Sequence, residues 1–124
     1  MNDLRSIPAY LMRGGTSKGL VFHKKDLPND RNLLTEYLLK IMGSPDIRQI
    51  NGIGGGTSVT SKVCIISKSL EKNVDIDYFF AQVEVDRMHV DYAPTCGNML
   101  SALGPFAIEE GLVETCNEIT QVNV

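Results

Sequence analysis

A cysteine at position 96 stands directly before a long apolar segment, residues 99–111, that is predicted to form a helix. The start of a helix exposes unpaired backbone N–H groups and the positive end of the helix dipole, which favour bound carboxylates and lower the pKa of a thiol. We therefore expect Cys96 to be a functional thiol, with Gly97 and Asn98 as donors to a small carboxylate substrate. The alternative is a buried cysteine that acts only as a small apolar side chain.

A lysine at position 62 follows a glycine-rich loop, residues 52–56, and lies in a segment that alternates as a strand does, residues 59–67. The alternation puts Lys62 on the same face as Cys64 and Ile66, so its amine should be partly desolvated. A lysine in such surroundings can act as a general base. The alternative is an ordinary lysine exposed to water.

A third group of polar residues lies between two short apolar runs, residues 7–12 and 20–23, which we expect to be strands. The loop between them offers backbone N–H groups, two hydroxyl groups and two cations. The residues of this loop assigned to substrate binding are Arg13, Gly15, Thr16, Ser17 and Lys18. Together with Lys62 and Cys96, they predict proton-transfer chemistry on an anion. The alternative is an exposed loop without such a role.

The glycine-rich loop does not fit a nucleotide-binding motif. A GxGxxG motif needs a third glycine where Thr57 stands, and a helix should follow it, whereas a strand is expected here. Lys62 also falls outside the spacing of a Walker loop. Two interpretations stay open: the glycines allow tight turns, or their N–H groups form a nest for carboxylate oxygens.

The composition argues against several classes of protein. The 124 residues carry a formal net charge of −3, which is unusual for a nucleic-acid-binding protein, and no segment resembles a signal peptide or a membrane span. The cysteines at positions 64, 96 and 116 have no metal-ligand spacing. We expect one domain over residues 1–124, in a cytoplasmic protein that needs no metal or other cofactor and has no nucleic-acid or membrane partner.

The expected framework begins with a helix that Asp30 can cap and Gly43 can end. The spacing of its apolar residues predicts an outer, amphipathic helix. The expected apolar face comprises Leu33, Leu34, Tyr37, Leu38 and Ile41.

Two further segments complete the framework before the apolar helix. The run of residues 74–85 is apolar enough for a central strand, and residues 119–124 alternate like another strand. The helix of residues 99–111 is apolar on nearly every side, so it should be enclosed by curved sheet, with a kink at Gly104-Pro105. Strands outnumber helices and hairpins are favoured, so the predicted fold class is α+β with a mostly antiparallel sheet.

Three segments of the chain resemble the PrpF family: residues 12–19, 54–63 and 95–107. They occur in that order and cover nearly the whole chain. The resemblance implies a fold similar to that of diaminopimelate epimerase, in which each of two related α+β domains wraps sheet around a central helix and the site lies in the cleft between them. This chain resembles the N-terminal domain, and we expect the second domain to be absent from it.

The PrpF family includes methylaconitate isomerases, methylitaconate isomerases and oxalomesaconate tautomerases. The resemblance implies that Lys62 and Cys96 are the catalytic lysine and cysteine, and that Ser17 and its loop contact the substrate. The implied activity is that of a cofactor-independent isomerase, which moves a proton in an unsaturated di- or tricarboxylate of the aconitate or methylaconitate class. The alternative is a truncated, non-catalytic domain that binds small carboxylates or self-associates, for example as a homodimer.

Overall fold

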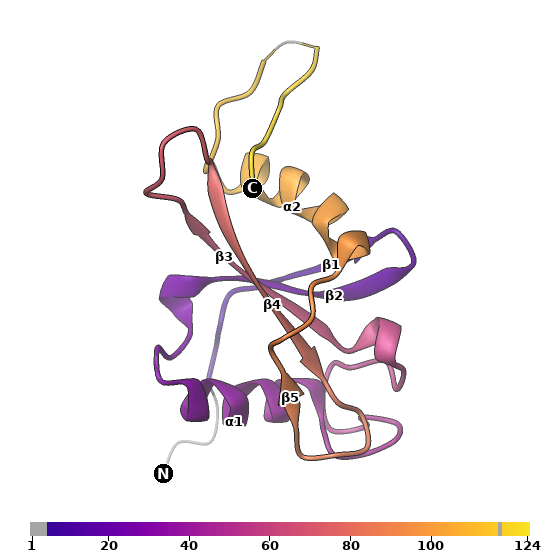
Figure 1. Cartoon of the computed structure of the whole chain (residues 1–124). Helices are drawn as coiled ribbons and strands as arrows, with labels where there is room; N and C mark the ends of the chain where they lie inside the picture. The colour runs from indigo at the N-terminus through magenta and orange to yellow at the C-terminus, as the bar shows by residue number, and fades with distance from the viewer. Residues whose placement is uncertain (1–4, 117) are drawn as a thin grey trace.

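A five-stranded sheet forms the middle of the protein, as described by a computed structural model for residues 5–116 and 118–124. One helix lies on each side of this sheet (Figure 1). The strands are β1 (Tyr10–Gly14), β2 (Ser17–His23), β3 (Lys62–Lys68), β4 (Ile76–Val83) and β5 (Val90–Asp91). The helices are α1 (Arg31–Met42) and α2 (Gly97–Glu109), and two 3-10 turns are η1 (Lys24–Asp26) and η2 (Ser58–Thr60).

The strands follow their sequence order across the sheet, β1-β2-β3-β4-β5. Three of the four neighbouring pairs are antiparallel, and β2 pairs in parallel with β3. This arrangement confirms the predicted α+β class and the mostly antiparallel sheet. Residues 74–85 contain β4, which is an interior strand as predicted, with β3 on one side and the two-residue β5 on the other.

The alternation along β3 divides the core into two layers, as the sequence predicts. Val63 and Ile65 pack on the face that α1 covers, whereas Cys64 and Ile66 pack on the face that α2 covers. The first two residues of the predicted strand, Val59 and Thr60, instead belong to the turn η2. Lys62 is consequently the first residue of β3, on the α2 side of the sheet.

Helix α1 has the predicted ends. The Asp30 side chain accepts a hydrogen bond of 3.0 Å from the Leu33 N–H, and Gly43 ends the helix in a left-handed conformation with φ of 89°. The buried face differs in part from the prediction, because Leu33 is 41% exposed. The buried residues of α1 are Leu34, Leu38, Leu39 and Met42.

Helix α2 starts at Gly97, two residues before the predicted start. The prediction that sheet encloses this helix is wrong. Leu100 is 40% exposed and Ile108 is 38% exposed, because in the described residues the sheet covers the opposite side of the helix. The buried side carries Met99, Leu103 and Phe106. The described helices include none that is both long and apolar enough to cross a membrane.

The segment 119–124 does not form the predicted strand. It is nevertheless tied to the sheet at one point, where the Asn123 carbonyl accepts hydrogen bonds from the N–H groups of Asp75 and Ile76. The Asn123 N–H in turn donates to the Asp75 carboxylate at 2.7 Å. The backbone therefore pairs with the start of β4 over too short a stretch to count as a strand.

Candidate functional site

The Cys96 side chain lies at the N-terminus of α2, where it occupies the N-cap position. The residue is 9% exposed, and its Sγ lies 3.9 Å from the hydroxyl of Ser17 on β2. Ser17 itself is only 1% exposed, so the hydroxyl is held against the sulfur by packing. The sequence prediction of a thiol at a helix start is confirmed in its geometry.

The surroundings of Cys96 favour its ionised form. Burial of the thiol raises its pKa, but the Met99 N–H and the Ser17 hydroxyl both lower it. The positive charge of Lys62 and the Asn98 N–H act in the same direction, and the net effect is a pKa of Cys96 below its ordinary value of 9.0. The thiol therefore ionises more readily than it would with an ordinary cysteine pKa.

The other two cysteines do not share this environment. Burial raises the pKa of Cys64 to about 12, although Tyr78 and Lys62 act to lower it. Cys64 is therefore a neutral thiol inside the core near pH 7, and Cys116 is exposed. Chemistry that uses two thiolates is not supported by these residues.

The amine of Lys62 reaches into the α2 side of the sheet from the start of β3. Its Nζ donates a hydrogen bond of 2.8 Å to the side-chain oxygen of Gln82, and it lies 5.3 Å from the centre of the Phe80 ring. Lys62 is half-buried, and its charge is close enough to lower the pKa of Cys96. The lysine and the thiol thus lie on the same side of the sheet, the side that α2 covers.

The hairpin between β1 and β2 packs against the first turn of α2. The Asn98 side-chain amide donates a hydrogen bond of 2.9 Å to the Thr16 hydroxyl. A Cβ atom at Gly14 would lie 2.5 Å from the Asn98 carbonyl oxygen, and Gly15 has a φ of 54°, so both positions favour glycine. The contact places Ser17 beside Cys96.

Two residues of the predicted substrate loop lie elsewhere. Arg13 and Lys18 pair across the hairpin, at positions that alternate with Ser17, and both are exposed. The Arg13 Nε donates a hydrogen bond of 3.2 Å to the Gly15 carbonyl. The structure therefore brings together Gly15, Thr16, Ser17, Lys62, Cys96, Gly97 and Asn98. Arg13 and Lys18 lie on the opposite face of the hairpin from Ser17, although the Arg13 guanidinium reaches the Gly15 carbonyl.

The glycine-rich loop does not form a nest for a ligand. Each N–H group of residues 52–56 donates to an acceptor within the protein. The loop wraps around Gln49, whose side-chain oxygen accepts a hydrogen bond of 2.9 Å from the Gly56 N–H. A Cβ atom at Gly54 would overlap the Gln49 amide, which explains why a glycine stands there. Of the two interpretations left open, tight turning is the one that the structure supports.

Two glutamines that support the site carry no signal in the sequence. Gln49 is 1% exposed, and its amide donates a hydrogen bond of 2.7 Å to the Ser61 hydroxyl, one residue before Lys62. Gln82 contacts Lys62 directly. Gln82 could be found only with knowledge of the β3–β4 register, and Gln49 only with knowledge of how its loop folds around the buried amide.

The candidate site is open to solvent at the start of α2. Gly97 and Asn98 are exposed at the start of α2. A hollow of about 680 Å³ lies on the other face of the sheet beside Arg31 and Phe79, and one of about 510 Å³ lies between Tyr10 and Phe106; neither is lined by Lys62 or Cys96. Throughout residues 5–116 and 118–124, no group of three or more His, Cys, Asp or Glu residues is placed to hold a metal ion.

Comparisons with known proteins agree on one family. The family model described as PrpF protein matches residues 4–124. The chain is 54% identical over 118 residues to the 4-oxalomesaconate tautomerase of Pseudomonas putida, which covers 95% of this chain and 33% of that protein. It is 45% identical over 122 residues to the 3-methylitaconate isomerase of Eubacterium barkeri, with coverage of 98% and 32%.

A solved structure gives the same result. The crystal structure of methylitaconate-delta-isomerase matches this fold with a TM-score of 0.91 and 46% identity, over 94% of this chain and 30% of that one. The chain spans about a third of the length of the curated relatives named above. Since the family model covers nearly all 124 residues, the chain belongs to the PrpF family.

Proposed function

We propose that this chain supplies the lysine, the thiol and the backbone donors of an isomerase that moves a proton between carbons of an unsaturated di- or tricarboxylate. Its relatives are named for isomerisation or tautomerisation of 3-methylitaconate, 2-methylaconitate and 4-oxalomesaconate. Methylated aconitate is the substrate class that we favour, followed by oxalomesaconate. The proposal extends to a diaminopimelate-epimerase-like architecture, with this chain as the N-terminal of two related domains.

The start of α2 is the proposed carboxylate site. Gly97 and Asn98 are exposed in the first turn, where N–H groups lack partners within the helix and the dipole favours negative charge. The Thr16 hydroxyl is fixed nearby through Asn98. A substrate carboxylate bound here would lie beside the Cys96 thiol, with its C–H group toward the Lys62 side.

The proposed reaction breaks a C–H bond that is flanked by a carboxylate and an alkene. The unprotonated Lys62 amine takes the proton and becomes an ammonium, while the electron pair of the C–H bond spreads over the alkene and the carboxylate as a dienolate. A proton then returns to the other end of this system, with the Cys96 thiol as donor or as the group that orients the substrate. This proton transfer needs neither a metal ion nor a redox cofactor.

Charge that develops on the carboxylate during this step would be stabilised by the helix N–H groups. A donor aimed at such an oxyanion lowers the activation barrier by about 2.7–4 kcal/mol. A positioned base typically adds roughly 10²–10⁴-fold to the rate. The observation that carries the proposal is geometric: the Cys96 thiol, the Ser17 hydroxyl and the Lys62 amine lie on the side of the sheet where α2 starts.

A chimera tests the proposal, since the relatives are about three times as long as this chain. In the chimera, the 124 residues replace the matching third of the Eubacterium barkeri 3-methylitaconate isomerase, to which they are 45% identical. Isomerisation of 3-methylitaconate, followed by ultraviolet absorbance, should proceed in the chimera and fall at least about 100-fold with Lys62→Ala. Lys68→Ala, an exposed position on the same strand, is the control.

Two results would contradict the proposal. A folded chimera without activity, beside an active parent enzyme, would show that this chain does not supply a working site. Equal rates for the chimera and its Lys62→Ala variant would remove the lysine from the mechanism.

A further inference from the structure

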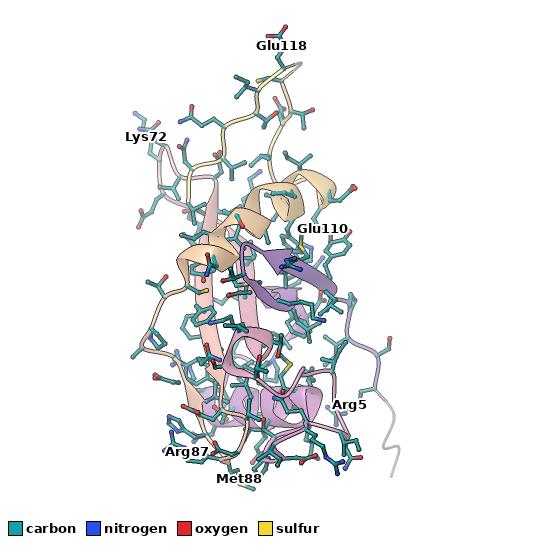
Figure 2. The ribbon with its side chains drawn as sticks, turned by 90° about the vertical axis from the view of Figure 1, so that its right-hand side faces the viewer. Arg5, Lys72, Arg87, Met88, Glu110 and Glu118 are labelled. Atoms are coloured by element: carbon teal, nitrogen blue, oxygen red, sulfur yellow. The ribbon has the colours of Figure 1, made fainter. Side chains whose placement is uncertain are left out.

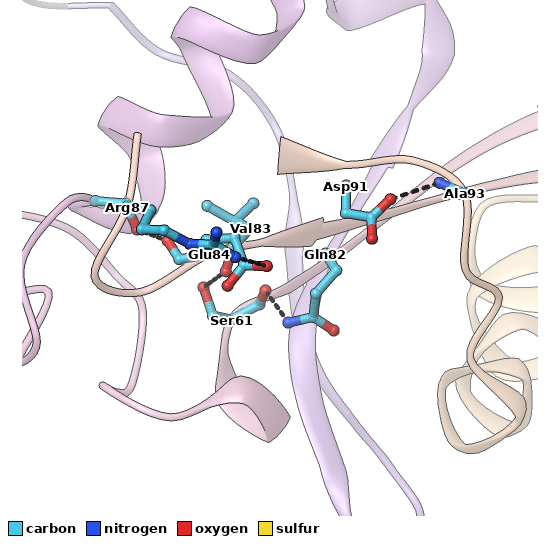
Figure 3. A network of polar contacts seen from close by, with 8 residues as sticks. Ser61, Gln82, Val83, Glu84, Arg87, Asp91 and Ala93 are labelled. Carbon is cyan, nitrogen blue, oxygen red and sulfur yellow. Dashed lines mark hydrogen bonds and ion pairs between the residues drawn. The ribbon is translucent and has the colours of Figure 1, made fainter. Parts of the chain in front are cut away.

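The side-chain amide of Gln82 on β4 can make all its hydrogen bonds in one orientation. Its nitrogen donates hydrogen bonds to two backbone carbonyls, that of Ser58 at 2.9 Å and that of Ser61 at 3.1 Å. Figure 3 shows the contact with Ser61. A rotated amide would turn its oxygen toward two carbonyl oxygens, so both N–H groups are committed and the Gln82 oxygen must point the other way.

The Gln82 oxygen points at Lys62. The two residues are direct partners in the antiparallel β3–β4 pair, and the Lys62 Nζ donates to the Gln82 oxygen at 2.8 Å. The Phe80 ring, two residues earlier on β4, lies 5.3 Å from the same Nζ. One neutral acceptor and one aromatic face therefore fix the end of the lysine side chain.

Lys62 has no carboxylate partner among the described residues, where the ion pairs are His23–Glu110 and Arg87–Glu84. The acid nearest in register is Asp91 on β5, which is the partner of Gln82 on its other side. The Asp91 carboxylate accepts a hydrogen bond of 3.0 Å from the Ala93 N–H and is turned toward it (Figure 3). Gln82 thus stands between the amine and this acid.

The other titratable groups on this side of the sheet leave the amine without a fixed counter-charge. Cys64 follows Lys62 on β3 as a neutral thiol, and Tyr78 on β4 donates to the Cys96 carbonyl at 3.5 Å. On β2 the register partner of Lys62 is Gly19, which carries no side chain. The lysine charge lowers the pKa of both nearby thiols, Cys64 and Cys96, but it has no carboxylate partner among these groups.

We infer that Gln82 is a positioning residue for the Lys62 amine: a neutral acceptor that fixes the end of the lysine side chain on the α2 side of the sheet and supplies no counter-charge. An amide oxygen accepts one N–H group and carries no net charge, whereas a carboxylate at the same place favours the charged amine strongly. The inference rests on the proposed function for its catalytic consequence, because a base must lose its proton before it can act. Its structural part stands on the contacts alone.

Competitive acetylation of the 124-residue chain with acetic anhydride, read by mass spectrometry across a pH series, tests the structural part without any activity. Gln82→Glu keeps the size and adds a charge, Gln82→Met keeps the length and removes the acceptor, and Gln121→Glu is an exposed control. Lys68, exposed on the same strand, is the internal reference in each sample. Circular dichroism confirms that each variant is folded.

We expect Lys62 in Gln82→Glu to be acetylated about tenfold more slowly at a given pH, because a carboxylate within hydrogen-bond reach favours the protonated amine. Gln82→Met should make Lys62 react faster, and Gln121→Glu should match the unchanged chain. Lys68 should react alike in all four proteins. If Lys62 reacts at the same rate in all of them, or changes in the same direction in both Gln82 variants, Gln82 does not control the amine and the inference is overturned.

The same variants in the chimera separate this inference from the proposed function. With Lys62 as the base, the pH at which the isomerisation rate is half its maximum should rise in Gln82→Glu, in parallel with acetylation. If acetylation shifts as expected and the rate profile does not move, Gln82 still positions Lys62, and the assignment of Lys62 as the base is what fails.

Discussion

The hydroxyl of Ser17 lies 3.9 Å from the Cys96 sulfur, although 79 positions separate the two residues in the chain. The contact exists because the β1–β2 hairpin packs on the first turn of α2 through Gly14 and the Thr16–Asn98 hydrogen bond. The ionisation of the thiol therefore depends on how this hairpin docks.

Replacement of Ser17 by alanine should make Cys96 less reactive. Loss of the hydroxyl removes one of the groups that lower the pKa of Cys96, so the thiolate fraction at pH 7 decreases. A hydrogen bond of about 1 kcal/mol corresponds to roughly a fivefold slower alkylation by iodoacetamide. The rates are measured from pH 6 to 10, with exposed Cys116 as the reference in the same sample. An unchanged pH midpoint for Cys96 would mean that Ser17 has no such effect.

Replacement of Gly19 by alanine should destabilise the protein. Gly19 pairs with Lys62 in the parallel β2–β3 ladder, and a Cβ atom there would overlap the Lys62 carbonyl. We expect a loss of about 1–3 kcal/mol in the free energy of unfolding, measured by urea denaturation. Gly104→Ala is the matched control, since its Cβ atom would meet nothing within 4 Å, and it should change stability by less than about 1 kcal/mol. Equal stability of the two variants would contradict the close approach of the strands.

Replacement of Gln49 by leucine should loosen the glycine-rich loop. Gln49 is buried with a φ of 48°, and its amide contacts the Ser61 hydroxyl, the Ser44 hydroxyl and the Gly56 N–H. Each buried polar group left without a partner costs about 1–3 kcal/mol. Hydrogen exchange at Gly56 should accelerate together with this loss of stability. The exposed Gln121→Leu serves as the control, and an unchanged exchange rate at Gly56 in Gln49→Leu would refute this role.

The end of α2 should respond to acid. Figure 2 shows Glu110 beside β1, where its carboxylate contacts His23 at 2.5 Å and accepts a hydrogen bond of 2.8 Å from Tyr10. The contact with His23, then that with Tyr10, lowers the pKa of Glu110 from its ordinary value of 4.5. The resulting stability is fully present above pH 4.5 and is lost as the pH falls through the lower, folded-state pKa.

Thermal unfolding between pH 6 and pH 3 measures this effect. The unchanged protein should exceed Glu110→Gln in melting temperature near pH 6, and the difference should shrink as the solution is acidified below pH 4.5. Glu109→Gln, at the neighbouring position, is the control and should not reproduce that trend. A difference that is constant with pH would rule out the contribution of the Glu110 carboxylate.

The parts of the fold that local chemistry determines could be predicted from the sequence. Asp30 and Gly43 mark the ends of α1 because each residue type satisfies a local requirement of the backbone. The period of two along β3 correctly put Lys62 and Cys64 on one face. The placement of Cys96 before α2 followed from the apolar run alone.

The parts that depend on pairing between distant segments could not be predicted. The N–H groups of residues 52–56 donate to acceptors within the protein, and the glycines in the sequence do not indicate these acceptors. Gln82 acts on Lys62 only because of the β3–β4 register. Arg13 and Lys18 are close in sequence to Ser17, but strand alternation turns them to the other side of the hairpin.

The parallel pairing of β2 with β3 should form later in folding than the β1–β2 hairpin. The β1–β2 hairpin closes through a two-residue turn, whereas Gly19 can meet Lys62 only after the whole crossover of residues 24–61, with α1 inside it, has been laid down. Closing so long a connection costs chain entropy before any contact compensates for it. A newly collapsed chain should therefore form the β1–β2 hairpin before Lys62 reaches its position beside Gly19. The group of residues around Lys62 and Cys96 should accordingly be assembled late in folding.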